Sequence, residues 1–141
     1  MHKFVSPTLL NLNITLMRKK ILFVVGILFG LMFLNAGLNK FFQYMPVPDN
    51  LPENMVKIFN ALMEFKWLLP LIAVAEITGG VLFMIPKVRA LGAIVIFPVM
   101  VGIVLTHLVN DPSGLLVALV LFAVNIWAII ENWGKYLVMI K

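Results

Sequence analysis

The chain has 141 residues, of which 62% are hydrophobic and 12% are charged, a balance outside the range of soluble globular proteins. It has no cysteine, which excludes disulfides, thiolate metal sites, iron–sulfur clusters and dithiol redox chemistry. Its two histidines, His2 and His107, are too distant in sequence to form a metal-binding pair, so no protein-ligated metal is predicted. The net charge of +5 comes with no basic patch containing interleaved aromatic residues, and no nucleic-acid partner is expected. The composition predicts a polytopic membrane protein.

Residues 1–20 end in three consecutive basic residues and are predicted to form a cytoplasmic tail, partly as a surface helix. Residues 21–40 are the first predicted span, an apolar run that Asn35 interrupts and that is long enough to cross the hydrocarbon. A cleavable signal peptide is the alternative interpretation. The length of the run and the lack of an A-x-A cleavage site argue against it.

Residues 41–66 are the only sizeable polar segment. Three prolines break helical structure in its first part, and apolar residues then recur at helical spacing. These residues are Met55, Ile58, Phe59, Leu62 and Met63. The pattern predicts an amphipathic helix over about 53–66, too short and too polar to span the membrane, which acts either as a surface anchor or as a lid over the helix bundle. The surface anchor is the favoured interpretation.

Three further spans are predicted over residues 67–86, 90–108 and 115–130, followed by a short amphipathic tail at 131–141. A tight turn at 110–114 separates the last two spans, and Pro98 is expected to kink the third. The predicted fold is therefore all-α, a bundle of four transmembrane helices in a domain over 21–130, with an interfacial amphipathic helix between the first two.

The distribution of basic residues predicts the orientation. Eight of the 11 Lys and Arg residues would lie on one side of the membrane: Lys3, Arg18, Lys19, Lys20, Lys87, Arg89, Lys135 and Lys141. The other side would hold Lys40, Lys57 and Lys66. Both termini are therefore expected in the cytoplasm, with the 41–66 loop on the periplasmic or outer side of the membrane.

Glu76 is the acidic residue that falls within a predicted span. Because an ionised acid in hydrocarbon costs at least about 2.5 kcal/mol, Glu76 should face the bundle interior and be paired, protonated or hydrated. Lys40 is its best cationic partner, and Asn125 is at a similar expected depth and could donate a hydrogen bond to it. His107 is expected near the outer interface. Two interpretations stay open: a structural polar cluster, or a proton-carrying or ligand-binding carboxylate with His107 as a relay.

Glycines mark the expected helix-packing faces. On a helical projection Gly26, Gly30 and Gly37 share one face of the first span, and Gly26 and Gly30 form a GxxxG pair. Gly80 lies on the same stripe of the second span as Glu76, with Gly79 beside it. Small residues let helices approach closely, so these five positions are predicted contacts between helices.

Two sequence motifs resemble the DoxX family of small four-helix bacterial membrane proteins. Residues 30–40, GLMFLNAGLNK, are similar to its first-helix pattern G-x-x-F-x-x-x-G-x-x-K, and residues 75–82, AEITGGVL, to its second-helix pattern A-E-x-x-G-G-x-L. Arg89 and Ala90 match the opening of its third helix. The resemblance covers about residues 20 to 130, and the family's usual Gly-rich polar C-terminal segment is not evident.

The resemblance implies links to a terminal quinol oxidase and thiosulfate:quinone oxidation, to thiol and oxidative-stress pathways, or to membrane-protein assembly. It points to Lys40, Glu76 and Arg89 as the residues to test. The lack of cysteine puts direct thiol exchange in doubt, and electron transfer would need a bound quinone or a partner's cofactor.

Three functional hypotheses follow. The first is a small accessory or assembly subunit, not itself an enzyme, whose partner in the bilayer is another membrane protein. The second is a quinone-linked oxidoreductase subunit in which Glu76 and Lys40 bind or protonate a quinone headgroup. The third is a small transporter acting as a homo-oligomer, which the lack of an inverted repeat disfavours.

Overall fold

The computed structural model describes residues 6–141, which form six α-helices and one short 3₁₀ turn, with no β-strand among them. Residues 1–5, which include His2 and Lys3 of the predicted cytoplasmic tail, lie outside this range. The predicted all-α class is confirmed.

Helix α1 (Pro7–Phe42) is a single helix of 36 residues, about 54 Å long at 1.5 Å per residue. The Ser6 side chain caps its start by accepting a hydrogen bond from the backbone N–H of Leu9, and Pro7 occupies the first turn, where its missing N–H costs nothing. The sequence suggested a tail and a separate span. The two are instead continuous, because no proline or capping signal follows the basic cluster until Gln43 ends the helix with a left-handed backbone (φ 49°).

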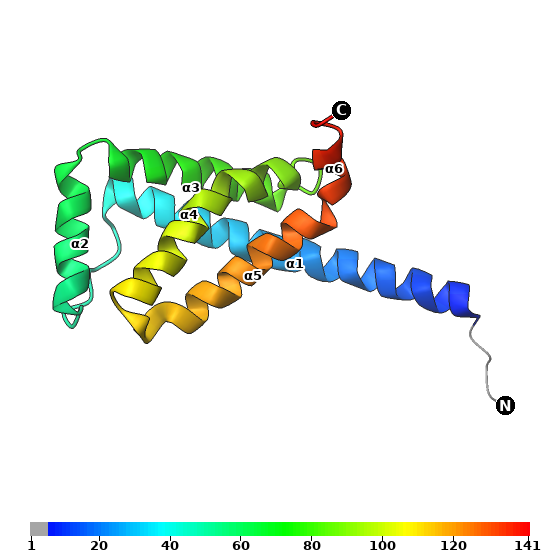
Figure 1. Cartoon of the computed structure of the whole chain (residues 1–141), viewed down its shortest axis with the longest axis horizontal. Coiled ribbons are helices and arrows are strands. Elements are labelled where there is room, and N and C mark those ends of the chain that lie inside the picture. Colours follow the sequence, from blue (N-terminus) through cyan, green and yellow to red (C-terminus); the bar gives the residue numbers. More distant parts are fainter. Residues whose placement is uncertain (1–5) are drawn as a thin grey trace.

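Helix α2 (Glu53–Glu64) lies across one end of the other helices, and the next helix, α3 (Leu68–Met84), turns away from it by 96° (Figure 1). Lys66, with φ 48°, lies in the turn between them. The half-buried residues of α2 are Met55, Ile58 and Leu62, which share one helical face, as the sequence pattern predicts for an amphipathic helix. We call the end of the bundle beside α2 the α2 end. The opposite end, where both described termini lie, is the terminal end.

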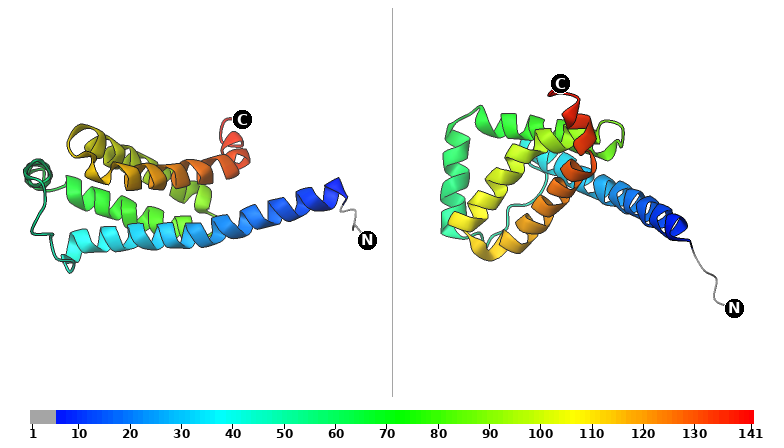
Figure 2. Two further views of the ribbon diagram at one scale, coloured as in Figure 1. Left: turned by 90° about the horizontal axis from the view of Figure 1, so that it is seen from below. Right: turned by 45° about the vertical axis from the view of Figure 1, so that its right-hand side comes forward.

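The remaining helices are α4 (Arg89–Val109), α5 (Leu115–Glu131) and the short α6 (Trp133–Leu137), with the 3₁₀ turn η1 (Pro112–Gly114) between α4 and α5. Figures 1 and 2 show α3 running beside α1 and in the opposite direction, with α4 and α5 following as an antiparallel pair. Helix α3 packs against both α1 and α4, and α4 packs against α5. The packing order is therefore α1, α3, α4, α5, with α1 and α5 touching only in part.

Helices α1, α4 and α5 (the last with η1) are each long and apolar enough to cross a membrane, and the bent pair α2 and α3 would count as a fourth candidate if it formed one span. Helix α3 alone has 17 residues, all but Glu76 and Thr78 without a polar side chain, and is about 25 Å long. Large apolar side chains are exposed along all of these helices. Such a surface suits lipid and not water, so the chain is an integral membrane protein.

Helices α1 and α3 pack closely at glycines. A methyl group added to Gly30 would lie 2.5 Å from the carbonyl oxygen of Gly80, and one added to Gly80 would lie 2.7 Å from that of Gly30. Towards the α2 end, a methyl group on Gly37 would lie 2.7 Å from the carbonyl oxygen of Ala73. These backbones touch because no Cβ separates them.

The glycine next to Gly80 serves the other neighbour of α3. A methyl group on Gly79 would meet Ile96 of α4, and one on Gly92 of α4 would lie 2.8 Å from the carbonyl oxygen of Gly79. Successive residues of a helix differ by about 100° in direction, so two adjacent glycines can face two different helices at the same level. Gly79 and Gly80 were predicted to form helix contacts from the sequence, and Gly92 was not.

We predict that Gly80→Ala destabilises the bundle by about 1–3 kcal/mol, because the new methyl group would press on backbone atoms that cannot move aside cheaply. Gly102→Ala is the matched control, since nothing lies within 4 Å of the added methyl group there. Thermal unfolding of the purified variants in the same mild detergent would compare them. Equal melting temperatures for the two variants would contradict the assigned helix contact.

Candidate functional site

An ion pair between Lys40 and Glu76 joins α1 to α3 near the α2 end. Lys40 Nζ lies 2.9 Å from Oε1 and 2.6 Å from Oε2 of Glu76, so the ammonium group donates to both carboxylate oxygens. Glu76 is only 3% exposed, whereas the Lys40 side chain keeps 26% of its surface accessible. The carboxylate is enclosed, and its partner reaches it from the edge of the bundle.

Local structure explains this placement. Lys40 is in the last turn of α1, where a cation interacts favourably with the helix dipole. Gly37, one turn earlier, lets α1 rest on the backbone of Ala73, one turn before Glu76 in α3. The glycine contact therefore brings the two charged side chains within reach of each other. Each then offsets much of the other's desolvation penalty.

On the opposite face of α1, two asparagine side chains bind the loop that follows the helix. Tyr44 donates its hydroxyl hydrogen to Asn35 Oδ1 at 2.5 Å, and the backbone N–H of Met45 donates to Asn39 Oδ1 at 2.8 Å. The two asparagines therefore stabilise the fold of the loop after α1 and take no part in the ion pair.

Asn125, expected to donate to Glu76, has a different partner. It is fully buried on α5, and its Nδ2 donates to the carbonyl oxygen of Ala93 on α4 at 3.1 Å. The depth estimate along the helix was reasonable, but α4 packs between α3 and α5 and keeps the amide away from the carboxylate. Asn125 therefore ties α4 to α5.

His107 belongs to the turn between α4 and α5. Its Nδ1 lies 2.9 Å from the carbonyl oxygen of Asp111, and its ring packs against Gly114. Ser113 donates to the Asp111 carboxylate from its hydroxyl and from its backbone N–H, and these bonds lower the pKa of Asp111. At pH values above the ordinary pKa of an aspartate, these hydrogen bonds stabilise the turn. This stabilisation is lost as the pH falls through the lowered pKa of Asp111. In residues 6–141 no hydrogen bond links His107 to Glu76.

Arg89 lies at the terminal end, away from the ion pair. It is 5% exposed, and its Nε donates to the carbonyl oxygen of Phe83 at 2.9 Å, close to the end of α3. The guanidinium group packs on α1 at Gly26, where an added methyl group would lie 2.9 Å from Nη2. The three residues that the family resemblance singled out therefore form two sites, Lys40 with Glu76 and Arg89 alone.

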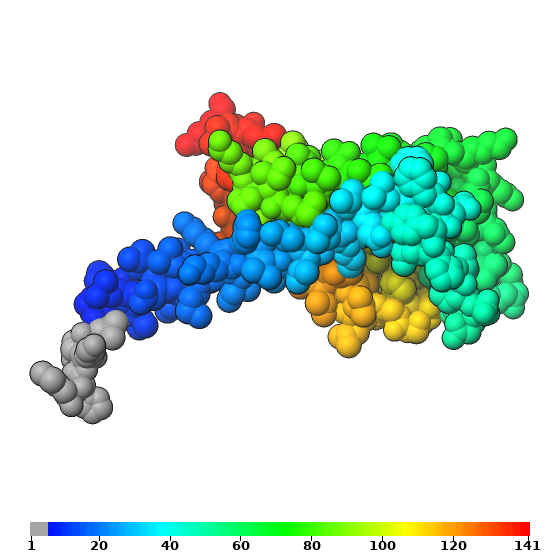
Figure 3. Space-filling model, turned by 180° about the vertical axis from the view of Figure 1, so that it is seen from behind, coloured from blue at the N-terminus to red at the C-terminus, as the bar shows by residue number. Residues whose placement is uncertain are grey.

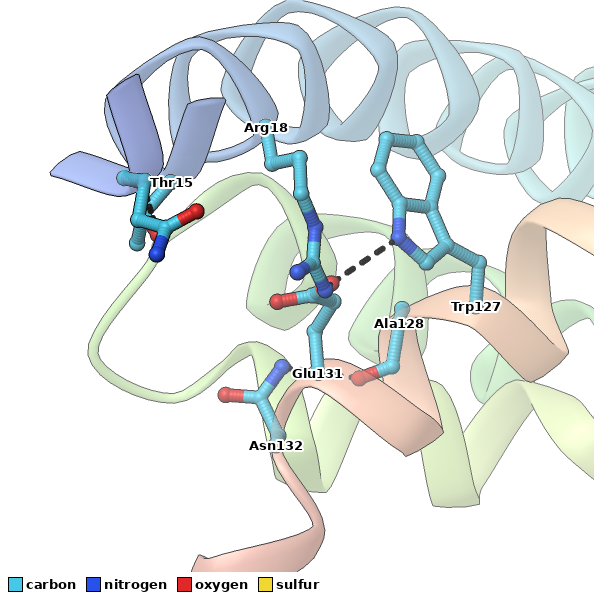
Figure 4. Close-up of polar contacts among 7 residues, drawn as sticks. Thr15, Arg18, Trp127, Ala128, Glu131 and Asn132 are labelled. Carbon is cyan, nitrogen blue, oxygen red and sulfur yellow. Dashed lines mark hydrogen bonds and ion pairs between the residues drawn. The ribbon is translucent and has the colours of Figure 1, made fainter. Parts of the chain in front are cut away.

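A second ion pair, which the sequence analysis missed, joins α1 to α5 at the terminal end. Arg18 pairs with Glu131, and Trp127 Nε1 donates to the same carboxylate at 3.2 Å (Figure 4). The sequence did carry a hint of this pair, because Arg18 and Glu131 were both predicted to lie on the same side of the membrane.

Residues 6–141 contain no group of three or more His, Cys, Asp or Glu side chains that could hold a metal ion.

We predict that Lys40 and Glu76 are energetically coupled by at least about 1 kcal/mol in a double-mutant cycle of Lys40→Met and Glu76→Gln. Lys40→Met should be the more damaging change, at about 3 kcal/mol or more, because it leaves a buried carboxylate without its partner. Thermal unfolding in detergent would measure the cycle.

The control cycle is Lys57→Met with Glu53→Gln, an ion pair on α2 whose side chains are 69% and 82% exposed. Its coupling should stay below about 0.5 kcal/mol, because water screens exposed pairs. Strictly additive effects at Lys40 and Glu76 would show that their contact contributes nothing.

Comparison with known proteins adds one finding. No curated protein and no solved structure matches the chain. The model of the DoxX-like family matches residues 24–129, a range that contains the glycine-rich motifs at 30–40 and 75–82 and all three of Lys40, Glu76 and Arg89. The match covers most of the chain and agrees with the motifs in α1 and α3. The chain belongs to the DoxX-like family.

Proposed function

We propose that the protein is a small accessory or assembly subunit of a larger membrane complex, and that it binds its partner through the first part of α1. The observation that carries this proposal is the segment Pro7–Met17, in which every residue is exposed although it is helical throughout. Figure 3 shows it projecting well beyond the rest of the bundle.

The projecting segment has a large apolar surface. Its exposed apolar side chains are Leu9, Leu10, Leu12, Ile14, Leu16 and Met17. At about 100° per residue they cover roughly 200° of the helix circumference, an arc that Asn13 interrupts, while Asn11 and Thr15 lie on the remaining face. A helix with so much apolar surface beyond the bundle needs either lipid or another protein to cover it.

The direction of the apolar arc favours a membrane-embedded partner. The polar face of the segment points the same way as the buried residues of α1, such as Gly26 and Phe33, further along the helix. Its apolar arc therefore continues the outward face of the rest of α1. One partner helix could pack along both.

The topology that goes with this proposal has four spans, α1, α3, α4 and α5, with α2 lying in the membrane interface. Both termini would be cytoplasmic in the bacterial inner membrane, because eight of the 11 Lys and Arg residues then lie inside. The near right angle between α2 and α3 supports an interfacial position for α2.

A second candidate function is supported by the partial exposure of Lys40. A ligand with a polar headgroup, such as a quinone, could approach Lys40 from the α2 end and exchange protons with Glu76 behind it. On this hypothesis Glu76→Gln would remove a quinone that co-purifies with the native protein.

For the first proposal we predict that a stoichiometric membrane-protein partner co-purifies from native membranes in mild detergent and is lost in the variant Leu9→Asn/Leu16→Asn. Both leucines lie on the apolar arc, and replacing them by polar residues removes apolar contact without touching the bundle. Mass spectrometry of the purified complex would identify the partner and its ratio to the chain.

The matched control is Asn11→Ser/Thr15→Ser on the polar face of the same segment, which should retain the partner. Equal recovery of the partner with both double variants would refute the role of the apolar arc. Recovery of no protein partner with the native chain would refute the accessory-subunit proposal.

A further inference from the structure

A groove of about 400 Å³ lies between α4, α5 and α6 at the terminal end. It is lined by Ile94, Phe97, Ile126, Ile129, Trp133 and Tyr136. Apart from the tips of Trp133 and Tyr136, the lining side chains are hydrocarbon. A groove of this kind on the outside of a membrane protein suits an acyl chain.

Helix α6 is fixed in place as one wall of the groove. Tyr136 donates its hydroxyl hydrogen to the carbonyl oxygen of Ala90 at 2.7 Å, and burial raises the pKa of Tyr136, so it remains a donor at neutral pH. Lys135 Nζ lies 3.3 Å from the carbonyl oxygens of both Pro86 and Lys87. The groove is therefore formed without help from another molecule.

Positive charge gathers where α6 meets the turn between α3 and α4. The Lys135 ammonium group reaches the backbone carbonyl oxygen of Lys87 there, and in residues 6–141 no carboxylate lies within ion-pair distance of Lys87 or Lys135. The Lys135 ammonium group has three hydrogens, two of which the carbonyl oxygens can take. One is left for an anionic oxygen, and the exposed side chain of Lys87 adds a second cation.

We infer that this groove is a binding site for an anionic phospholipid, with an acyl chain against α4 and α5 and the headgroup phosphate beside Lys87 and Lys135. The distances agree with this arrangement. Phe97 lies eight residues beyond Arg89, about 12 Å along α4, so the groove covers the upper part of an acyl chain whose headgroup is level with the basic residues. Trp133 and Tyr136 lie between the two, at the depth that aromatic residues prefer in membranes.

The charges favour a lipid over a second protein helix. Basic pockets between membrane helices bind anionic headgroups, and each lysine near the surface contributes to the attraction. No cation lines the groove itself, but Lys135 lies on α6 between two of its lining residues, Trp133 and Tyr136. A second groove, of about 210 Å³ between α1 and α5, has an equally apolar lining that includes Val25 and Leu121. That groove provides an internal control within the same bundle.

The test is native mass spectrometry and thermal unfolding of the full chain, delipidated in mild detergent and then given phosphatidylglycerol or phosphatidylcholine. We expect one phosphatidylglycerol to bind and raise the melting temperature, with phosphatidylcholine binding at least about tenfold more weakly. Lys87→Gln/Lys135→Gln should weaken phosphatidylglycerol binding by about tenfold or more. Lys19→Gln/Lys20→Gln, which removes the same charge elsewhere at the terminal end, should leave it unchanged.

A second pair of variants tests the groove itself. Ile126→Trp fills it, and Leu121→Trp fills the control groove on the same helix. Binding should be lost in the first and kept in the second, with circular dichroism confirming that both fold. Equal binding of the two lipids, or equal loss in both lysine pairs or in both tryptophan variants, would overturn the assignment.

Discussion

The close contact of α3 with two neighbouring helices is the constraint on which the rest of the bundle depends. Inside a membrane there is no hydrophobic drive to bring helices together, so packing at small residues must supply it. Gly80 meets α1 and Gly79 meets α4 at the same level of α3. This fixes the register of three helices at once. The register then decides which polar side chains can meet, including Lys40 with Glu76.

Much of the fold could be predicted from the sequence because helix length and glycine periodicity are local properties. The positions of α3, α4 and α5 agree with the predicted spans to within about two residues, a normal uncertainty for helix ends. The start of α1 could not be predicted in the same way. Hydropathy shows where a helix becomes apolar and not where it begins. The start of α1 is set by the cap at Ser6, which hydropathy does not detect.

The candidate site was predictable only in part, for a different reason. Depth along a helix follows from counting residues, and it placed Lys40 and Glu76 within reach of each other. The order in which helices pack around the bundle does not follow from counting. Asn125 and His107 were therefore predicted to lie beside Glu76. In the structure Asn125 bonds to α4 and His107 to the turn between α4 and α5. Gly92 and the pair of Arg18 with Glu131 were missed because each depends on a partner distant in sequence.

The continuity of α1 has a mechanical consequence. One unbroken helix runs from the projecting segment, past the Arg18 and Glu131 pair, to Lys40 in its last turn. A helix resists bending far more than a loop does, so a protein bound to the projecting segment would be held at a fixed position relative to the bundle. Helix α1 is anchored by the contacts of Gly30 and Gly37 with α3 and by the pair of Arg18 with Glu131. The projecting segment is therefore a rigid extension of the bundle.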